Sequence, residues 1–298
     1  MTIFSMIRVL AAAALVGCAL ALAGCFMTPG KFSSELALTG PDSFTFRYEG
    51  EIFLLGLSKL AMMDATSETA FTANCFDDET YESRDCTPEE VASQREEWEA
   101  GAAARAENAK QKAQQMAALM GGIDPSDPKA SEELVKLLQR QKGWDRVVHK
   151  GDGVFDVSYR VSGTLGHDFM FPMIEGFPAT NPFVQLIQRK GGQVRITAPG
   201  FSGEAGGMDL MMGLGSRTGL TAMGVAVEAR EAGTNGEAVP GIPVIDGTFT
   251  VRAAPGMRIL ANNTDEGPAA ATDGGEVLTW QISPRTAQAP TALIAAAH

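Results

Sequence analysis

Histidine is scarce in this chain, with three residues among 298. His149, His167 and His298 do not form the His-x-x-x-His or His-Glu-x-x-His patterns that bind zinc. The Gly-x-Ser-x-Gly turn that carries the nucleophile of many hydrolases does not occur either. The sequence therefore predicts no metal site, no cofactor and no catalytic residue. If the chain were an enzyme, His167, which Asp168 follows, would be the first residue to mutate.

Basic residues are also few, and they form no cluster interleaved with aromatic side chains. The chain has 24 Lys and Arg against 36 Asp and Glu, which gives a formal net charge of -12. Such a charge repels the phosphates of nucleic acids, so we predict that nucleic acid is not a partner. The same charge argues against electrostatic docking onto anionic lipid headgroups.

The apolar run at residues 9–23 is shorter than the roughly 20 residues that a membrane-spanning helix requires. It follows Arg8, which is the only charged residue before Lys31, and it ends in small residues. A positive start, an apolar stretch and a small-residue cleavage site are the parts of a secretory signal peptide. We therefore predict that residues 1–24 are a signal peptide.

Residues 22–25, Leu-Ala-Gly-Cys, resemble the lipobox of bacterial lipoproteins. The resemblance implies cleavage before Cys25 and lipidation of its thiol and amine, which anchors a protein without a spanning helix. Residues 15–18, Leu-Val-Gly-Cys, are a second partial match, but Cys18 would leave too short an apolar run. An ordinary signal peptide with an incidental cysteine is the alternative. Phe26 replaces the Asp of inner-membrane retention signals, which predicts an outer-membrane lipoprotein facing the periplasm.

Two cysteines remain in the mature chain, Cys75 and Cys86, eleven positions apart. In an oxidising compartment such a pair usually forms a disulfide. A metal site would need further ligands, and residues 62–142 contain no other His or Cys. Redox motifs place their cysteines closer together. We therefore predict a structural disulfide between Cys75 and Cys86.

Alternating apolar residues predict most of the strands. Residues 36–48 alternate on both sides of a Gly-Pro-Asp turn, and residues 183–197 alternate on both sides of a Lys-Gly-Gly turn, so each predicts a β-hairpin. Residues 53–63 have the apolar spacing of a helix face, with a buried strand as the alternative. Further strands are predicted over residues 154–161, 220–232, 248–253, 257–261 and 277–282.

The segment between these two groups of strands is predicted to be helical. Residues 87–90, Thr-Pro-Glu-Glu, place a hydroxyl at the N-cap, Pro at the first helical position and Glu at the third. The Ala-, Glu-, Lys- and Gln-rich sequence that follows predicts a helix over about 88–120, either continuous or interrupted near Gly101. A second helix is predicted over about 128–142.

Helices gathered in one segment between runs of strands indicate an α+β fold with a largely antiparallel sheet. We predict a lipidated tether over residues 25–31 and a single α+β domain over residues 32–298. The helical insertion occupies residues 75–143 of that domain.

Short motifs near both ends of the mature chain resemble uncharacterised bacterial lipoproteins of the LppM-like group. These are residues 48–51 (Tyr-Glu-Gly-Glu), 259–263 (Ile-Leu-Ala-Asn-Asn) and 278–282 (Leu-Thr-Trp-Gln-Ile). The resemblance implies an α+β sheet closed by a Trp-bearing strand and a role in binding envelope lipids. The chain departs from that group in its helical segment 75–143 and in lacking a C-terminal membrane helix.

Two functions fit the sequence. The first is a non-enzymatic, membrane-anchored periplasmic lipoprotein that binds a lipid or another apolar ligand, with the Gly- and Met-rich residues 199–219 as a loop over the cavity. The alternative is an interaction lipoprotein that supports an envelope assembly through its helical segment. Its partners would then be the membrane, through the lipid on Cys25, and an envelope protein.

Overall fold

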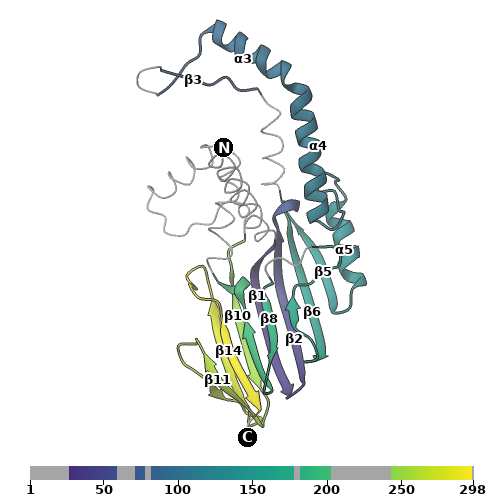
Figure 1. Cartoon of the computed structure of the whole chain (residues 1–298), viewed down its shortest axis with the longest axis vertical. Coiled ribbons are helices and arrows are strands. Elements are labelled where there is room, and N and C mark those ends of the chain that lie inside the picture. Colours follow the sequence, from purple (N-terminus) through teal and green to yellow (C-terminus); the bar gives the residue numbers. More distant parts are fainter. Residues whose placement is uncertain (1–26, 59–70, 78–81, 178–181, 203–242, 297–298) are drawn as a thin grey trace, which may run out of the picture.

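The computed structural model describes residues 27–58, 71–77, 82–177, 182–202 and 243–296. They form two β-sheets packed face to face and a helical segment that extends from one end of the sheets (Figure 1). The predicted α+β class and the largely antiparallel pairing are confirmed. The division of the strands between two sheets was not predicted.

The larger sheet has seven strands in the order β12-β13-β10-β1-β2-β6-β5. Its β1 and β10 pair in parallel, and its other neighbours pair antiparallel. The strands are β1 Met27–Gly40, β2 Ser43–Leu54, β5 Trp144–Gly151, β6 Val154–Thr164, β10 Asp246–Ala253, β12 Ala269–Ala270 and β13 Glu276–Ile282.

The smaller sheet has five antiparallel strands in the order β11-β14-β9-β8-β7. Both predicted hairpins are present, one as β1 and β2 and the other as β8 and β9. The strands are β7 Phe169–Phe171, β8 Val184–Arg189, β9 Gln193–Thr197, β11 Met257–Asn262 and β14 Thr291–Ala296.

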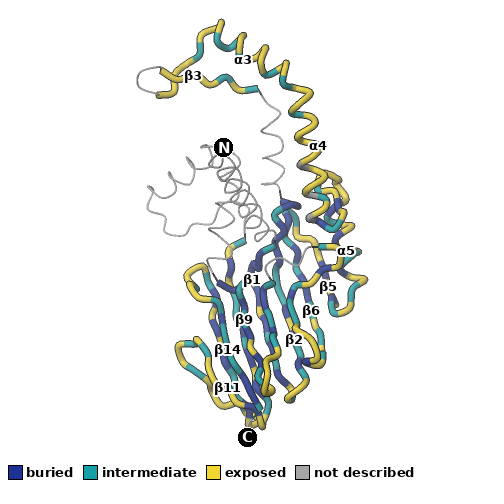
Figure 2. The backbone as a smooth tube through the Cα atoms, viewed as in Figure 1, coloured by how far each residue is buried: buried dark blue, intermediate teal, exposed yellow. Residues whose placement is uncertain are grey.

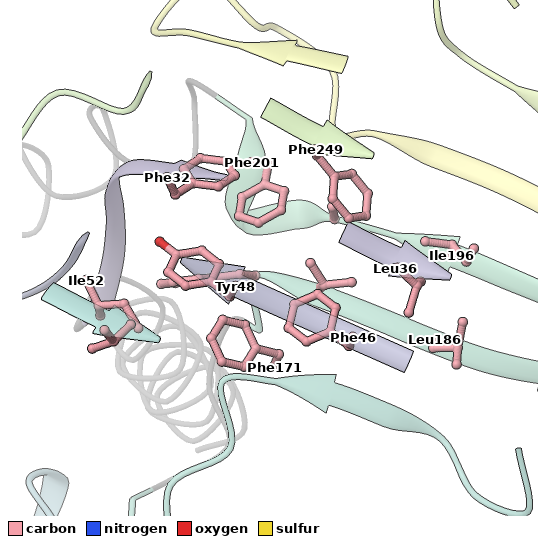
Figure 3. Close-up of a cluster of buried hydrophobic side chains, with 14 of the residues drawn as sticks. Phe32, Leu36, Phe46, Tyr48, Ile52, Phe171, Leu186, Ile196, Phe201 and Phe249 are labelled. Carbon is pink, nitrogen blue, oxygen red and sulfur yellow. The ribbon is translucent and has the colours of Figure 1, made fainter. Parts of the chain in front are cut away.

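Alternation along the strands creates the core, because every second side chain points at the other sheet. In β2, Phe46 and Tyr48 are fully buried and face Phe171 of the smaller sheet, with ring centroids 5.0 Å apart in both pairs (Figure 3). Beside them, Phe32 stacks on Phe201 at 4.3 Å. Aromatic rings from both sheets therefore fill the space between them in this region.

A β-bulge near the start of β1 explains the break in the alternation of its buried residues. The pairing register shifts between Pro29 and Phe32, and Gly50 stands opposite the shift with a φ of 147°. A Cβ at this position would lie 2.3 Å from the carbonyl oxygen of Lys31, so only glycine fits.

The predicted helix over residues 53–63 is wrong in the part that the structure describes. β2 continues through Phe53 to Leu54, and only a short 3-10 turn, η1 Leu55–Leu57, follows. The pairing of Phe53 with Thr28 and Val154 outweighs the helical spacing, so the buried-strand alternative holds there. The predicted tether also overlaps β1, which begins at Met27.

The predicted helical segment is present as three helices, α3 Pro88–Ala100, α4 Ala102–Leu119 and α5 Ala130–Arg140. The long helix is interrupted at Gly101, in agreement with one of the two alternatives. α5 buries Leu134 and Leu138 beside β5, whereas α3 and α4 extend away from the sheets (Figure 2). The predicted strand over 220–232 lies outside the described residues.

Replacing Phe46 by alanine tests the core. The ring is fully buried and contacts both sheets, so Phe46→Ala should lower the free energy of unfolding by about 3–5 kcal/mol. Arg47→Ala, on the exposed face of the same strand, should change it by less than about 0.5 kcal/mol. Urea unfolding measures both values, and equal losses would show that this face is not the core.

Candidate functional site: a disulfide-locked helical arm

The most distinctive described feature is a helical arm, defined as residues 71–77 and 82–119. It extends from the end of the sandwich where β2 finishes, and its outer part bends back at Gly101 (Figure 1). No residue of α3 is buried, and the described side chains of α4 are exposed or half-buried. The described residues of α3 and α4 therefore contribute no fully buried side chain to the sandwich.

The base of the arm is fixed to the sandwich just after α4. Met120 is fully buried in the core, and Gly122 N–H donates to the Ala117 carbonyl at 2.8 Å to close the helix. Gly121 takes a φ of 64° and packs against Phe177, where a Cβ would lie 3.0 Å from the ring. These contacts set the direction in which the arm leaves the sandwich.

The tip of the arm is closed by the predicted disulfide between Cys75 and Cys86, whose Cα atoms lie 5.3 Å apart. Cys75 is the first residue of β3 Cys75–Phe76, which pairs antiparallel with β4 Ser83–Arg84, and Cys86 lies two residues after β4. Cross-links of this kind act mainly by restricting the unfolded chain, and a loop of this length is stabilised by about 3 kcal/mol. The disulfide thus orders a segment that has no core of its own.

The predicted capping box starts α3. The Glu90 N–H donates to Thr87 Oγ1 at 3.3 Å, and the Thr87 N–H donates back to Glu90 Oε2 at 2.9 Å. The Arg84 guanidinium donates to both carboxylate oxygens of Glu90, at 2.9 and 2.6 Å. The hydrogen bonds from Arg84 and from Thr87 lower the pKa of Glu90 from 4.5 to about 2.

The incoming segment of the arm is held along α3 by polar and aromatic contacts. The side chain of Gln94 donates to the Asn74 carbonyl at 3.0 Å and accepts from the Asn74 N–H at 3.1 Å. Phe71 packs edge-on against Trp98, with ring centroids 5.9 Å apart. Arg95 lies 4.6 Å from the Phe71 ring centroid, and Arg105 lies 4.1 Å from that of Trp98. Arg105 belongs to α4, so this stack also bridges the break at Gly101.

The cap, the disulfide and the aromatic stack are needed because an isolated helix of fewer than about 12–15 residues has only marginal stability in water. α3 has 13 residues and no buried face. Its cap, its disulfide and its aromatic stack supply locally the stability that a core would otherwise supply. A sequence that stabilises a solvent-exposed helix in this way keeps its surface in one fixed shape.

The outer part of the arm is strongly acidic. The described residues 71–77 and 82–100 contain two basic residues, Arg84 and Arg95, and eight acidic residues. Phe76 is 56% exposed beside the disulfide, which places an apolar ring within the acidic tip. The acidic residues are Asp77, Glu82, Asp85, Glu89, Glu90, Glu96, Glu97 and Glu99.

The other predicted residues do not meet in one place. Cys25 and residues 203–219 lie outside the described part of the chain. His167 is exposed in the turn between β6 and β7, and Asp168 accepts a hydrogen bond from the Gln188 N–H at 3.4 Å. The search for catalytic motifs thus did not predict the arm. The capping box and the cysteine pair did predict the elements at its tip.

One described cluster has donors that could suit a metal ion, namely Cys75, Cys86 and Glu90, with ligand atoms within 4.8 Å of one another. Both sulfurs are joined in the disulfide, however, and the Glu90 carboxylate is paired with Arg84. A thiolate is the form of cysteine that binds metals, so the oxidised pair does not suit the role. We interpret the cluster as structural.

Comparisons with protein-family models, curated protein sequences and solved structures found no match. The resemblance to LppM-like lipoproteins therefore stays a prediction, as does the lipobox at Cys25. Among the described residues, no helix is both long and apolar enough to cross a membrane.

Removing the disulfide should loosen the arm and leave the sandwich intact. In Cys75→Ser/Cys86→Ser, residues 71–100 should lose about 3 kcal/mol of local stability, since the loop-closing constraint is lost. Hydrogen exchange with mass spectrometry should show faster exchange in the arm peptides alone. A matching increase in the peptides of β2 and β8 would contradict the independence of the arm.

Acidification should weaken the cap of α3 at an unusually low pH. Because the folded pKa of Glu90 lies below its ordinary value, the stabilisation is complete above pH 4.5 and is lost as the pH falls towards about 2. The amide proton of Thr87, which donates to Glu90, should report a midpoint near pH 2 by NMR. In Glu90→Gln, which preserves the capping geometry, this titration should disappear, and a midpoint at 4.5 would contradict the assigned pairing.

Proposed function

We propose that this protein is a lipid-anchored envelope protein that holds an interaction arm in a fixed position and binds an envelope protein through it. The observation that carries the proposal is the arm itself, in which a helix without a buried face is stabilised by a cap, a disulfide and an aromatic stack. An exposed helix that several local contacts hold in one conformation is best explained by a role in binding a partner protein. The lipobox and the disulfide support a location in the oxidising periplasm.

The chemistry of the arm indicates what the partner offers. Acidic residues dominate its outer part, and they favour encounter with a basic surface. Exposed Phe76 and half-buried Trp98 supply the apolar contacts that usually carry binding energy at the centre of an interface. We therefore expect a basic protein surface with an apolar pocket.

Binding of a lipid or another apolar ligand within the sandwich stays a prediction. The geometry supports it less well, because Phe46, Tyr48, Phe171 and Phe201 occupy the described space between the sheets. Only residues 199–202 of the loop expected to cover a cavity are described, and there η2 Pro199–Phe201 buries its Phe in the core.

Site-specific photo-crosslinking in intact envelopes tests the proposal. A crosslinking residue in place of exposed Glu97 on α3 should give a discrete adduct with an envelope protein. The same residue in place of exposed Thr279 on β13 should not. Absence of any adduct specific to the arm would refute the proposed role.

Charge reversal supplies the matched control. With the crosslinker at position 97, Glu96→Lys/Glu99→Lys should lower the adduct yield about tenfold, corresponding to roughly 1.4 kcal/mol of binding free energy. Asp265→Lys/Glu266→Lys makes the same change of charge in an exposed turn of the sandwich and should leave the yield unchanged. Equal effects of the two variants would show that the net charge of the chain, and not the arm, governs the encounter.

A further inference from the structure

The predicted lipid attachment point lies close to the folded sandwich. β1 begins at Met27, two residues after Cys25, and Met27 pairs with Leu54 at the end of β2. Two extended residues span about 7 Å. A lipid on Cys25 would therefore hold this end of the sandwich against the membrane surface, with no long tether between them.

The arm leaves the sandwich from that same end. Leu54 leads directly into η1, and Figure 1 shows η1 and the base of α4 at the end of the sheets from which the arm extends. The 18 residues of α4 extend about 27 Å beyond this end. A rigid arm that continued along the strands would enter the bilayer.

Entry into the bilayer is excluded by the polarity of α4. Arg105, Glu107 and Lys110 are exposed or half-buried along it, and charged side chains are costly in hydrocarbon. A tilt that lays α4 along the membrane surface keeps its charged side chains out of the hydrocarbon. The two-residue link permits tilting but does not permit the sandwich to move far from the lipid.

The charges of the two halves of the arm agree with this orientation. Residues 102–119 contain three basic residues and one acidic residue, in contrast to the acidic residues 71–100. Basic residues near a membrane are attracted to anionic headgroups within about 8–10 Å of the surface. The chain as a whole is acidic although this segment is basic, because all but one of its 36 acidic residues lie outside residues 102–119.

We propose that α4 lies along the membrane surface, in contact with anionic lipid headgroups, and presents the acidic tip to a partner held at the same membrane. The inference rests on the lipid anchor of the proposed function. Each headgroup contact is weak, but the anchor keeps α4 at a high effective concentration near the headgroups. Binding through the tip then requires a partner that the arm can reach along the surface.

Short-range fluorescence quenching in vesicles tests the orientation. The lipidated full-length protein is labelled at Ala109→Cys in α4, an exposed position. In phosphatidylethanolamine–phosphatidylglycerol vesicles with nitroxide headgroups, the Ala109 label should lose most of its fluorescence. In nitroxide-bearing vesicles without phosphatidylglycerol, the same label should lose much less.

Variants and neutral vesicles separate the possible outcomes. Lys110→Glu or replacement of phosphatidylglycerol by phosphatidylcholine should reduce quenching at Ala109, whereas Lys190→Glu in the β8–β9 turn should not. If the protein stays bound to vesicles but quenching at Ala109 is the same with and without phosphatidylglycerol, the orientation is overturned while the anchor stands. If lipidated protein cannot be recovered and Cys25→Ser changes nothing, the anchor and the orientation fail together.

Discussion

Within the described chain, α3 buries none of its residues, and this constraint governs the sequence of the arm. A helix that buries no face gains nothing from the hydrophobic effect on that face, so its stability must come from contacts within a few residues. The capping box at Thr87, the cross-link at Cys75 and the stack of Phe71 on Trp98 are such contacts. Each is modest alone, and together they keep the tip ordered at a distance from the core.

The sandwich supplies the fixed base that the arm needs. Its stability comes from rings that two sheets contribute to one interior, with Phe46 and Phe171 as a central pair. Met120 carries the end of α4 into that interior, so the direction of the arm is set by a buried contact. The lipid anchor, if placed at Cys25, would orient the same base towards the membrane.

Local features were predictable and distant pairings were not. The start of α3, the break at Gly101 and the hairpin of β1 with β2 each depend on residues close together in sequence. The helix expected over 53–63 is wrong in its described part, 53–58, because Phe53 pairs with Val154, about a hundred residues away. Apolar spacing in so short a run cannot distinguish a helix from a buried strand.

The sequence by itself determined the alternation of the strands, the helical segment and the partner of Cys75, because these follow from residue spacing and from Cys86 being the other cysteine after Cys25. Tertiary structure alone decided that the long strands divide between two sheets, that β1 lies parallel to β10, and that no described residue of α3 is buried. The physical reason is that an exposed helix and a packed helix can have the same local sequence signals. Which of them forms depends on whether the fold brings an apolar sheet surface against the helix. In the described chain, α5 packs against β5, whereas α3 packs against no strand of either sheet.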